Sequence, residues 1–312
     1  MDKHSRSNAG EAGMALLEER LRQHVTALTG IGSRFTFTSQ SAKHVSLDLS
    51  HPEAKDRKLD YLRGCLSELG YHCDTDSFPA PGYDGLEGTN LYARRASDAS
   101  AALIEVGAHF DTLGTTGADD NCSGVAGVLE LARLLRDEPV VAGIRFCLYD
   151  LEELGFLGSA HHVQTMKEPV RLAIILESVG YTSTEPNSQR TPLRIPLVFN
   201  PPRVGDFICL IGNNRARSSR WIKDYEQHAR AADPQLKTFS IIKMTRFLRD
   251  AVRSDHKPYW DAGIDAIMLT DTADFRNPNY HTGEDAVEAL DFAFLASVTS
   301  RCAQTLCGRA IT

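Results

Sequence analysis

The amino-acid sequence predicts an α/β protein built in layers around a largely parallel β-sheet. Apolar runs of strand length alternate along the chain with longer segments whose apolar residues recur at helical spacing. The run 170–177 is apolar almost throughout rather than at alternate positions, which is typical of a strand buried on both faces. The chain has 312 residues, of which 42% are hydrophobic and 24% charged, so it can bury a sizeable core.

The individual elements follow from periodicity and from residues that stop helices, such as Gly70 after an amphipathic segment. The expected helices cover residues 11–29, 57–69, a segment beginning at Ser123, 216–230 and 285–307. The expected strands cover residues 71–78, 90–95, 102–107, 143–149, 170–177, 205–212 and 264–270.

The same pattern indicates a single domain over residues 1–312, with a helical lead-in over 1–55. Residues 182–205 are rich in Pro, Ser and Asn and could form a domain linker. A long surface excursion is the preferred interpretation, because a strand-like pattern resumes directly afterwards and candidate site residues lie on both sides.

Composition excludes several classes of partner. The net charge is −7 without a basic stripe, so we expect no nucleic-acid partner. No apolar run approaches the roughly 18 residues of a membrane span, and no signal-peptide core is visible, so we expect no membrane partner. Seven cysteines, an odd count without CxxC spacing, are typical of buried apolar side chains in a reducing compartment, which favours the cytoplasm.

Histidine or carboxylate side chains follow several of the expected strands. In open α/β sheets, ligands bind beyond the carboxyl ends of the strands, so we expect these side chains to converge. A cluster of carboxylates would repel itself unless a cation lay among them. In chain order, the residues are His109 and Asp111, Asp119 to Asn121, Glu152 and Glu153, Glu177, and His281.

Charge counting supports a pair of divalent ions. Asp120, Glu153 and Glu177 contribute three negative charges, whereas the two imidazoles are neutral ligands. Two divalent cations would leave one positive charge, which favours a hydroxide at neutral pH. Mixed imidazole and carboxylate ligands suit Zn²⁺, although Mn²⁺ or Co²⁺ could substitute.

Six motifs occur in the order found in the co-catalytic di-zinc aminopeptidases: GAHFDT, GADDNCSG, DLEELGFLGS, LESVGY, RSDHKPYWDAGIDAI and NYHTGED. Over roughly residues 55–307 the chain resembles this family, which includes the bacterial leucyl and Streptomyces-type aminopeptidases and is related to glutamate carboxypeptidase and glutaminyl cyclase. The resemblance implies a zinc exopeptidase-like, three-layer α/β/α fold with a mixed, largely parallel central sheet.

The resemblance also implies a set of metal ligands. Asp120 would bridge two zinc ions. His109 and Glu177 would complete the first site, and Glu153 and His281 the second.

Further roles follow from the same resemblance. Glu152 would be the general base beside a bridging hydroxide, and Asp111 would hold the tautomer of the first histidine ligand, with Asn121 in a supporting part. Arg253 matches an arginine near the substrate carbonyl but could instead form a surface salt bridge. Tyr280 could donate a hydrogen bond to the oxyanion or simply pack over the metal site.

Some positions depart from the family pattern or have a plainer interpretation. Glu177 stands where the family more often has Asp; because Glu is one methylene longer, either its backbone lies further from the metal or its carboxylate binds differently. Cys122 is expected to be structural rather than a ligand. The pair His161 and His162 is expected on the surface, because adjacent side chains diverge on a helix.

We therefore expect a metal-dependent exopeptidase, an aminopeptidase that uses two zinc ions and acts on a peptide or small amide. Carboxypeptidase, acyl-amino-acid deacylase or glutaminyl cyclase chemistry at the same site, and a non-catalytic metal-binding protein, stay open as alternatives. The sequence makes no prediction of oligomeric state.

Overall fold

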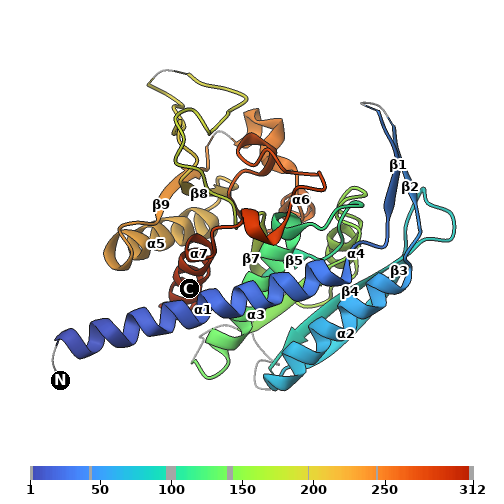
Figure 1. Ribbon diagram of the computed structural model, residues 1–312, viewed down its shortest axis with the longest axis horizontal. Helices are drawn as coiled ribbons and strands as arrows, with labels where there is room; N and C mark the ends of the chain where they lie inside the picture. The colour runs from blue at the N-terminus through green and yellow to red at the C-terminus, as the bar shows by residue number, and fades with distance from the viewer. Residues whose placement is uncertain are drawn as a thin grey trace.

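The structure is a computed structural model that describes residues 3–41, 44–95, 103–138, 143–195, 197–243 and 245–308, with backbone alone for 3–9, 36–48 and 246. Within them an eight-stranded mixed sheet forms the centre of the molecule, and a two-stranded hairpin projects from it (Figure 1). The hairpin strands are β1 (Thr36–Ser41) and β2 (His44–Asp48). The sheet strands are β3 (His72–Pro79), β4 (Glu87–Arg94), β5 (Leu103–His109), β6 (Ile144–Tyr149), β7 (Val170–Glu177), β8 (Phe207–Gly212), β9 (Lys237–Ile241) and β10 (Ala266–Thr270).

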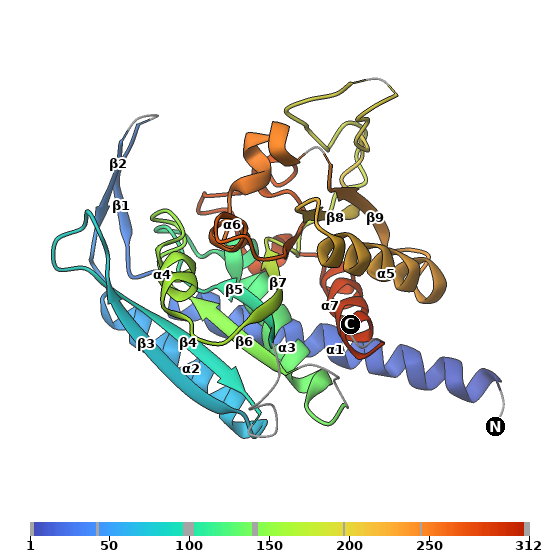
Figure 2. The same cartoon turned by 180° about the vertical axis from the view of Figure 1, so that it is seen from behind.

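Helices cover both faces of this sheet, as Figures 1 and 2 show from opposite sides. The helices are α1 (Lys3–Ile31), α2 (Glu53–Glu68), α3 (Gly124–Leu135), α4 (Leu157–Thr165), α5 (Ala216–Ala232), α6 (His256–Asp261) and α7 (Phe292–Cys307).

Alternate side chains along a strand pack into two separate apolar layers. On β6, Phe146 and Leu148 pack in the layer that includes residues of α1, α2, α3, α5 and α7, whereas Cys147 and Tyr149 pack with Tyr259 of α6. The three-layer α/β/α arrangement predicted from the sequence is therefore confirmed.

The strand order places four carboxyl ends side by side. The order is β3-β4-β6-β5-β7-β10-β8-β9, and β6, β5, β7 and β10 are mutually parallel neighbours. In register, His109 lies opposite Tyr149, and Glu177 lies opposite Thr270. The chain leaves β5 toward β6 on one side and then returns to β7 on the other, so β5 is a switch point of the kind at which α/β proteins bind ligands.

The predicted strands all occur, but some helix boundaries and short elements differ from expectation. Helix α7 begins at Phe292 instead of residue 285, because the Asp291 carboxylate accepts a hydrogen bond from the Phe294 N–H at 2.9 Å and caps the helix there. The hairpin β1–β2, the short helices α4 and α6, and edge strand β9 were missed. Strand β9 pairs with β8 alone and is only partly buried, so it lacks the apolar run that marks the central strands.

Residues 182–205, between β7 and β8, contain no helix or strand in their described part. Two isolated bridges shape this segment, Ser183 with Gly205 and Ile195 with Phe199 (yellow in Figure 1). The first bridge brings the two ends of the segment together. Separately, no helix in the described ranges combines the length and apolar character needed to span a bilayer.

A buried polar network links β5, β6, α4 and α6 on the face covered by the last two. The carboxylate of Glu105, which is 0% exposed, accepts hydrogen bonds from Arg145 at 2.6 Å and Tyr259 at 2.6 Å and lies 3.0 Å from the His162 Nε2. His162 is therefore buried, and the expectation that it lies on the surface is wrong. The neighbouring His161 is partly exposed and stacks on Phe78.

This network predicts a pH-dependent stability. Burial opposes ionisation of Glu105, but His162 and Arg145 outweigh it and hold the pKa at about 2, below the usual 4.5. The charged carboxylate therefore stabilises the fold above pH 4.5, and this contribution is lost as the pH falls toward 2. Glu105→Gln is expected to lower the free energy of unfolding at pH 7 by about 3 kcal/mol, and by less at pH 3, as measured by urea denaturation.

Glu168 provides the matched control. It pairs with the same Arg145 at 2.7 Å, but its side chain is 39% exposed. Glu168→Gln is expected to cost less than about 1 kcal/mol at either pH. Equal losses for the two variants at pH 7 would contradict the assignment of the effect to the buried carboxylate.

Candidate metal centre

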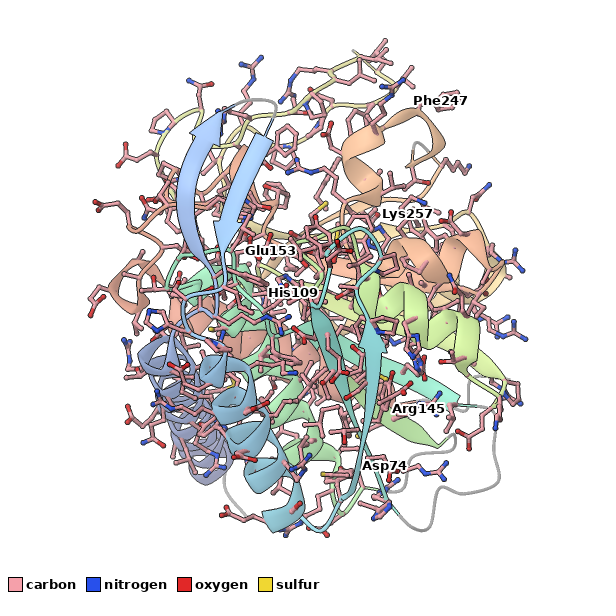
Figure 3. The ribbon with its side chains drawn as sticks, turned by 90° about the vertical axis from the view of Figure 1, so that its right-hand side faces the viewer. Asp74, His109, Arg145, Glu153, Phe247 and Lys257 are labelled. Carbon is pink, nitrogen blue, oxygen red and sulfur yellow. The ribbon has the colours of Figure 1, made fainter. Side chains whose placement is uncertain are left out.

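The predicted site residues meet at the edge of the sheet where β5, β6, β7 and β10 end. His109 and Glu153 lie close together at the end of the central strands (Figure 3). His109 ends β5 and Glu177 ends β7, while Glu152 and Glu153 lie in the turn after β6. Asp120 lies in the short π-helical segment η2 (Ala118–Ser123) before α3, and His281 lies in the loop that follows β10.

A first group of donors surrounds the imidazole of His109. Its Nε2 atom lies 3.2 Å from Asp120 Oδ1, 3.4 Å from Glu177 Oε2 and 4.0 Å from Glu152 Oε2. The imidazole itself is fully buried. One ligand atom each from His109, Glu152 and Glu177 lies close enough to the others to share an ion.

A second group surrounds the imidazole of His281. Its Nε2 atom lies 2.9 Å from Asp120 Oδ2 and 3.2 Å from Glu153 Oε2. These three residues also lie close enough to share one ion. The two oxygens of Asp120 thus face different imidazoles, which joins the two groups into one centre.

The arrangement of these donor atoms suits bound metal ions and does not form hydrogen bonds among the donors. His109 Nε2, Asp120 Oδ1, Glu153 Oε1 and His281 Nε2 are buried and make no hydrogen bond of acceptable geometry within the described chain. Orphaned buried polar atoms are rare and costly in native proteins. Two imidazoles and several carboxylates that converge without hydrogen bonds to one another are the donor set of a zinc site.

Burial and mutual repulsion disturb the ionisation of this cluster. Burial raises the pKa of Glu153 to about 7 and raises the pKa of Glu152 and Glu177 above their usual value, and in each case a neighbouring carboxylate adds to the effect. Burial lowers the pKa of His281, but its contacts with Asp120 and Glu153 outweigh this and raise it to about 10. Without a cation among them, these buried carboxylates therefore take up protons more readily than exposed ones do.

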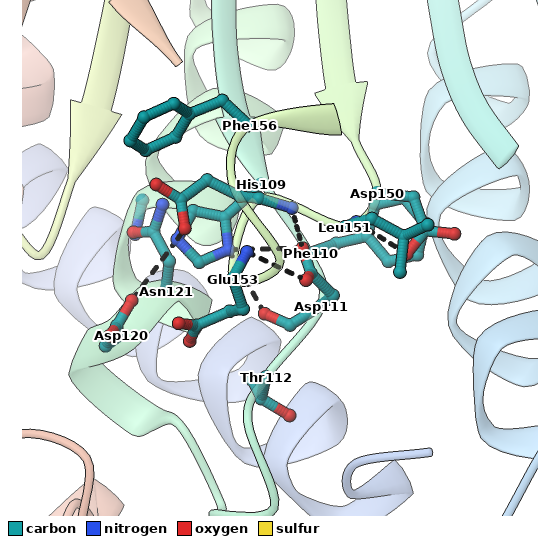
Figure 4. A network of polar contacts seen from close by, with 12 residues as sticks. His109, Phe110, Asp111, Thr112, Asp120, Asn121, Asp150, Leu151, Glu153 and Phe156 are labelled. Atoms are coloured by element: carbon teal, nitrogen blue, oxygen red, sulfur yellow. Dashed lines mark hydrogen bonds and ion pairs between the residues drawn. The ribbon is translucent and has the colours of Figure 1, made fainter. Parts of the chain in front are cut away.

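Asp111 supports the site mainly by binding backbone N–H groups of the neighbouring turn. Its carboxylate accepts a hydrogen bond from the N–H group of Glu152 at 3.1 Å. It also accepts one from the N–H group of Glu153 at 3.3 Å (Figure 4). The Nδ1 atom of His109 lies 3.1 Å from the Asp111 backbone carbonyl and 3.4 Å from its carboxylate. The carbonyl makes the shorter contact, so it favours the tautomer with Nδ1 protonated and Nε2 free for a metal.

Asn121 ties the Asp120 segment to the end of β7. Its amide donates to the Leu176 carbonyl at 2.9 Å, and its side-chain oxygen accepts from the Ser178 N–H at 3.1 Å. Only glycine fits at position 124 beside it, because a Cβ there would lie 2.3 Å from the Asn121 side-chain oxygen. Cys122 is buried, which raises the pKa of its thiol to about 11, and it joins neither donor group, in agreement with a structural role.

Two supporting residues were not assigned from the sequence. The Asp285 carboxylate accepts from the N–H groups of Asp119 at 2.9 Å and Asp120 at 3.1 Å. The Ser254 hydroxyl donates to Glu177 Oε2 at 2.7 Å. Both residues lie inside motifs recognised in the sequence, but nothing in the sequence reveals which side chain each one contacts.

Arg253 and Tyr280 border the site without a hydrogen bond to its donors. Arg253 donates to Asp274 at 3.1 Å and has a side chain that is 45% exposed. Tyr280 stacks on His281, with ring centroids 3.9 Å apart, and burial raises the pKa of its hydroxyl. Both residues line a pocket that also reaches Glu177.

A third group of possible donors lies away from this centre. It consists of Glu105, Cys147 and His162. Arg145 occupies the space beside Glu105 and already neutralises it. The guanidinium would repel a cation, so this group is a structural network and not a metal site.

Comparison with known proteins identifies the family of this chain. The sequence pattern of peptidase family M28 matches residues 90–306. The Escherichia coli protein YfbL is 33% identical over 275 residues, which cover 80% of both chains. The Bacillus subtilis aminopeptidase YwaD is 31% identical over 196 residues, which cover 60% of this chain and only 37% of YwaD.

Among solved structures, the Legionella pneumophila aminopeptidase LapA superimposes with a TM-score of 0.68 at 18% identity, covering 98% of this chain and 74% of LapA. This likeness concerns the fold. The fold, the donor groups and the sequence matches together define a zinc metallopeptidase. The chain belongs to peptidase family M28.

Proposed function

We propose that the protein is an aminopeptidase that uses two zinc ions. His109, Asp120 and Glu177 would hold the first ion, and Asp120, Glu153 and His281 the second. The observation that carries this proposal is the position of Asp120, whose two oxygens lie 3.2 Å and 2.9 Å from the Nε2 atoms of two different histidines. Mn²⁺ or Co²⁺ could replace zinc, because the same ligand types suit them.

The chemistry follows from the position of Glu152. When bound, two zinc ions supply Lewis acidity, which polarises a carbonyl and makes water more acidic. Glu152 is 8% exposed, and by distance it belongs to the first donor group, with His109 and Glu177, but not to the second. It can therefore take a proton from the attacking water and pass it to the leaving amine.

An apolar pocket beside the site suits a substrate side chain. It reaches Glu177 and Tyr280. Its apolar lining suits an apolar substrate side chain adjacent to the scissile bond. The apolar lining comes from Phe199, Phe207, Cys209, Ile211, Phe239, Ile241, Leu248, Ala251 and Met268.

We further propose that the protein acts as a single domain in the cytoplasm on peptides or small amides, without nucleic-acid or membrane partners. The dispersed charge and the seven cysteines, which form no disulfide, support this.

The test is a panel of substrates assayed with and without a chelator. Amides of leucine and phenylalanine with a free α-amine are expected to be hydrolysed at least about 10-fold faster, by kcat/KM, than those of glycine or aspartate, since even one methylene group in an apolar pocket gives about 1–3 kcal/mol of discrimination. Chelation is expected to abolish hydrolysis, and added zinc to restore it.

The same panel decides between the alternatives. Faster turnover of N-acylated or carboxyl-terminal substrates would replace the aminopeptidase proposal with deacylation or carboxypeptidase action. Ammonia release from an amino-terminal glutaminyl peptide without hydrolysis would indicate cyclisation. Tight zinc binding without turnover of any member would leave a non-catalytic metal-binding protein.

A further inference from the structure

The turn that carries Glu152 and Glu153 has an unfavourable backbone. Leu151 and Phe156 both have φ of +61°, in the left-handed region that side chains with a Cβ rarely adopt. Such conformations persist only where the surrounding structure holds them. The contacts that hold this turn therefore decide where the two glutamates point.

Two buried carboxylates hold the turn. Asp111 accepts the N–H groups of Glu152 and Glu153, as described above. Asp150, which is 0% exposed, accepts the N–H of Leu151 at 3.0 Å through Oδ1 and the N–H of Thr89 at 2.9 Å through Oδ2. Three consecutive N–H groups are thus bound by the side chains of two aspartates.

The charge of Asp150 is matched by Arg34. The Arg34 guanidinium, on a residue only 5% exposed, donates to Asp150 Oδ1 at 2.7 Å. A buried carboxylate without a partner is costly, so this pair keeps Asp150 in place. The two nearby lysine side chains make their hydrogen bonds to other groups. Lys58 donates to the Phe110 carbonyl at 2.9 Å, and Lys55 donates to the Thr89 hydroxyl at 3.3 Å.

Arg34 lies between α1 and β1, well before the family match begins at residue 90. We propose that Arg34 is a positioning residue for the metal centre: through Asp150 it holds the turn that aims Glu153 at the second ion and Glu152 at the substrate. This inference rests on the proposed function. It gives the amino-terminal part of the chain a direct role in the site.

The test exploits an asymmetry between the two ions. The ligands of the first ion, His109, Asp120 and Glu177, lie outside the turn, whereas the second ion needs Glu153. Arg34→Met is expected to weaken the second ion about 10–100-fold, the usual effect of losing a supporting contact behind a metal ligand. The affinity for the first ion should change less than about threefold, because none of its ligands lies in the turn. Titration calorimetry of the metal-free protein with zinc measures both affinities.

Further variants sharpen the result. Arg34→Lys keeps the charge and is expected to recover part of the affinity for the second ion. Arg20→Met is the matched control, because it removes another guanidinium that pairs with a buried carboxylate, Glu130 at 2.9 Å, on a different part of the molecule. If Arg34→Met does not fold, Arg34→Gln takes its place. In an Asp150→Asn background, adding Arg34→Met should have little further effect.

The outcomes separate this inference from the proposed function. Wild-type protein that binds fewer than two zinc ions, or binds two without hydrolysing any substrate, contradicts the proposed function. Wild-type protein that binds two ions, together with an Arg34→Met protein whose second-ion affinity is unchanged, overturns the positioning role. The positioning role is also overturned if Arg34→Met weakens the binding of both ions equally, or if Arg20→Met weakens the binding of the second ion as much. It is overturned as well if Arg34→Met has its full effect in the Asp150→Asn background.

Discussion

Replacement of Glu152 by glutamine is expected to lower kcat by about 10²–10⁴-fold, the usual contribution of a general acid–base. Glutamine has nearly the same shape but cannot accept a proton, so the turn and the pocket should be preserved. The Glu152 carboxylate lies 4.0 Å from His109 Nε2, at the rim of the first donor group. Zinc content, measured by elemental analysis, should stay at two ions per chain, and KM should change much less than kcat.

Glu68→Gln on the exposed face of α2 serves as the control, and it should leave both kcat and zinc content unchanged. Full activity of a zinc-loaded Glu152→Gln protein would remove Glu152 from the mechanism. Loss of one ion from that protein would instead make Glu152 a ligand, which its grouping with His109 and Glu177 permits on geometry alone.

Asp120→Asn is expected to weaken the binding of both zinc ions by at least about 100-fold. Even the loss of a residue that hydrogen-bonds to a metal ligand costs about 10–100-fold in metal affinity. An amide carries no charge, so the centre would keep two formal negative charges among its proposed ligands where the wild type has three. Bound zinc per chain after dialysis and the zinc-dependent rise in melting temperature measure the effect. The rise should largely vanish, since a ligand stabilises the folded state only in proportion to its binding.

His281→Ala is the informative comparison, because His281 touches only the second donor group. It should release one ion and leave the other. A protein with Asp120→Asn that still retains one tightly bound ion would contradict the bridging role of Asp120. It would show that one histidine with its own glutamate holds zinc unaided.

Much of the sheet could be predicted, because the central strands are buried on both faces and their apolar runs are local signals. Strand β7, with six consecutive buried residues, is the clearest case. Elements whose apolar pattern is short or broken could not be predicted. Edge strand β9 and the six-residue helix α6 belong to this group, since their stability comes from the elements they pack against.

The site shows the same division. Its candidate residues could be named in advance because strands that run parallel end at one edge, and because the motifs around them resemble a known family. Their supports could not. His162 lies on a short helix with a weak pattern, and it is buried only because Glu105 on β5 meets it from another strand.

The sequence by itself determined the layered α/β class, the succession of the central strands and the residue types that end them, because local periodicity or a short motif encodes each of these. Only the tertiary structure decided that the two oxygens of Asp120 face different histidines, and that Arg34, Ser254 and Asp285 stand behind the site. These are contacts between segments far apart in the chain. Their partners depend on how layers pack, which no local pattern encodes.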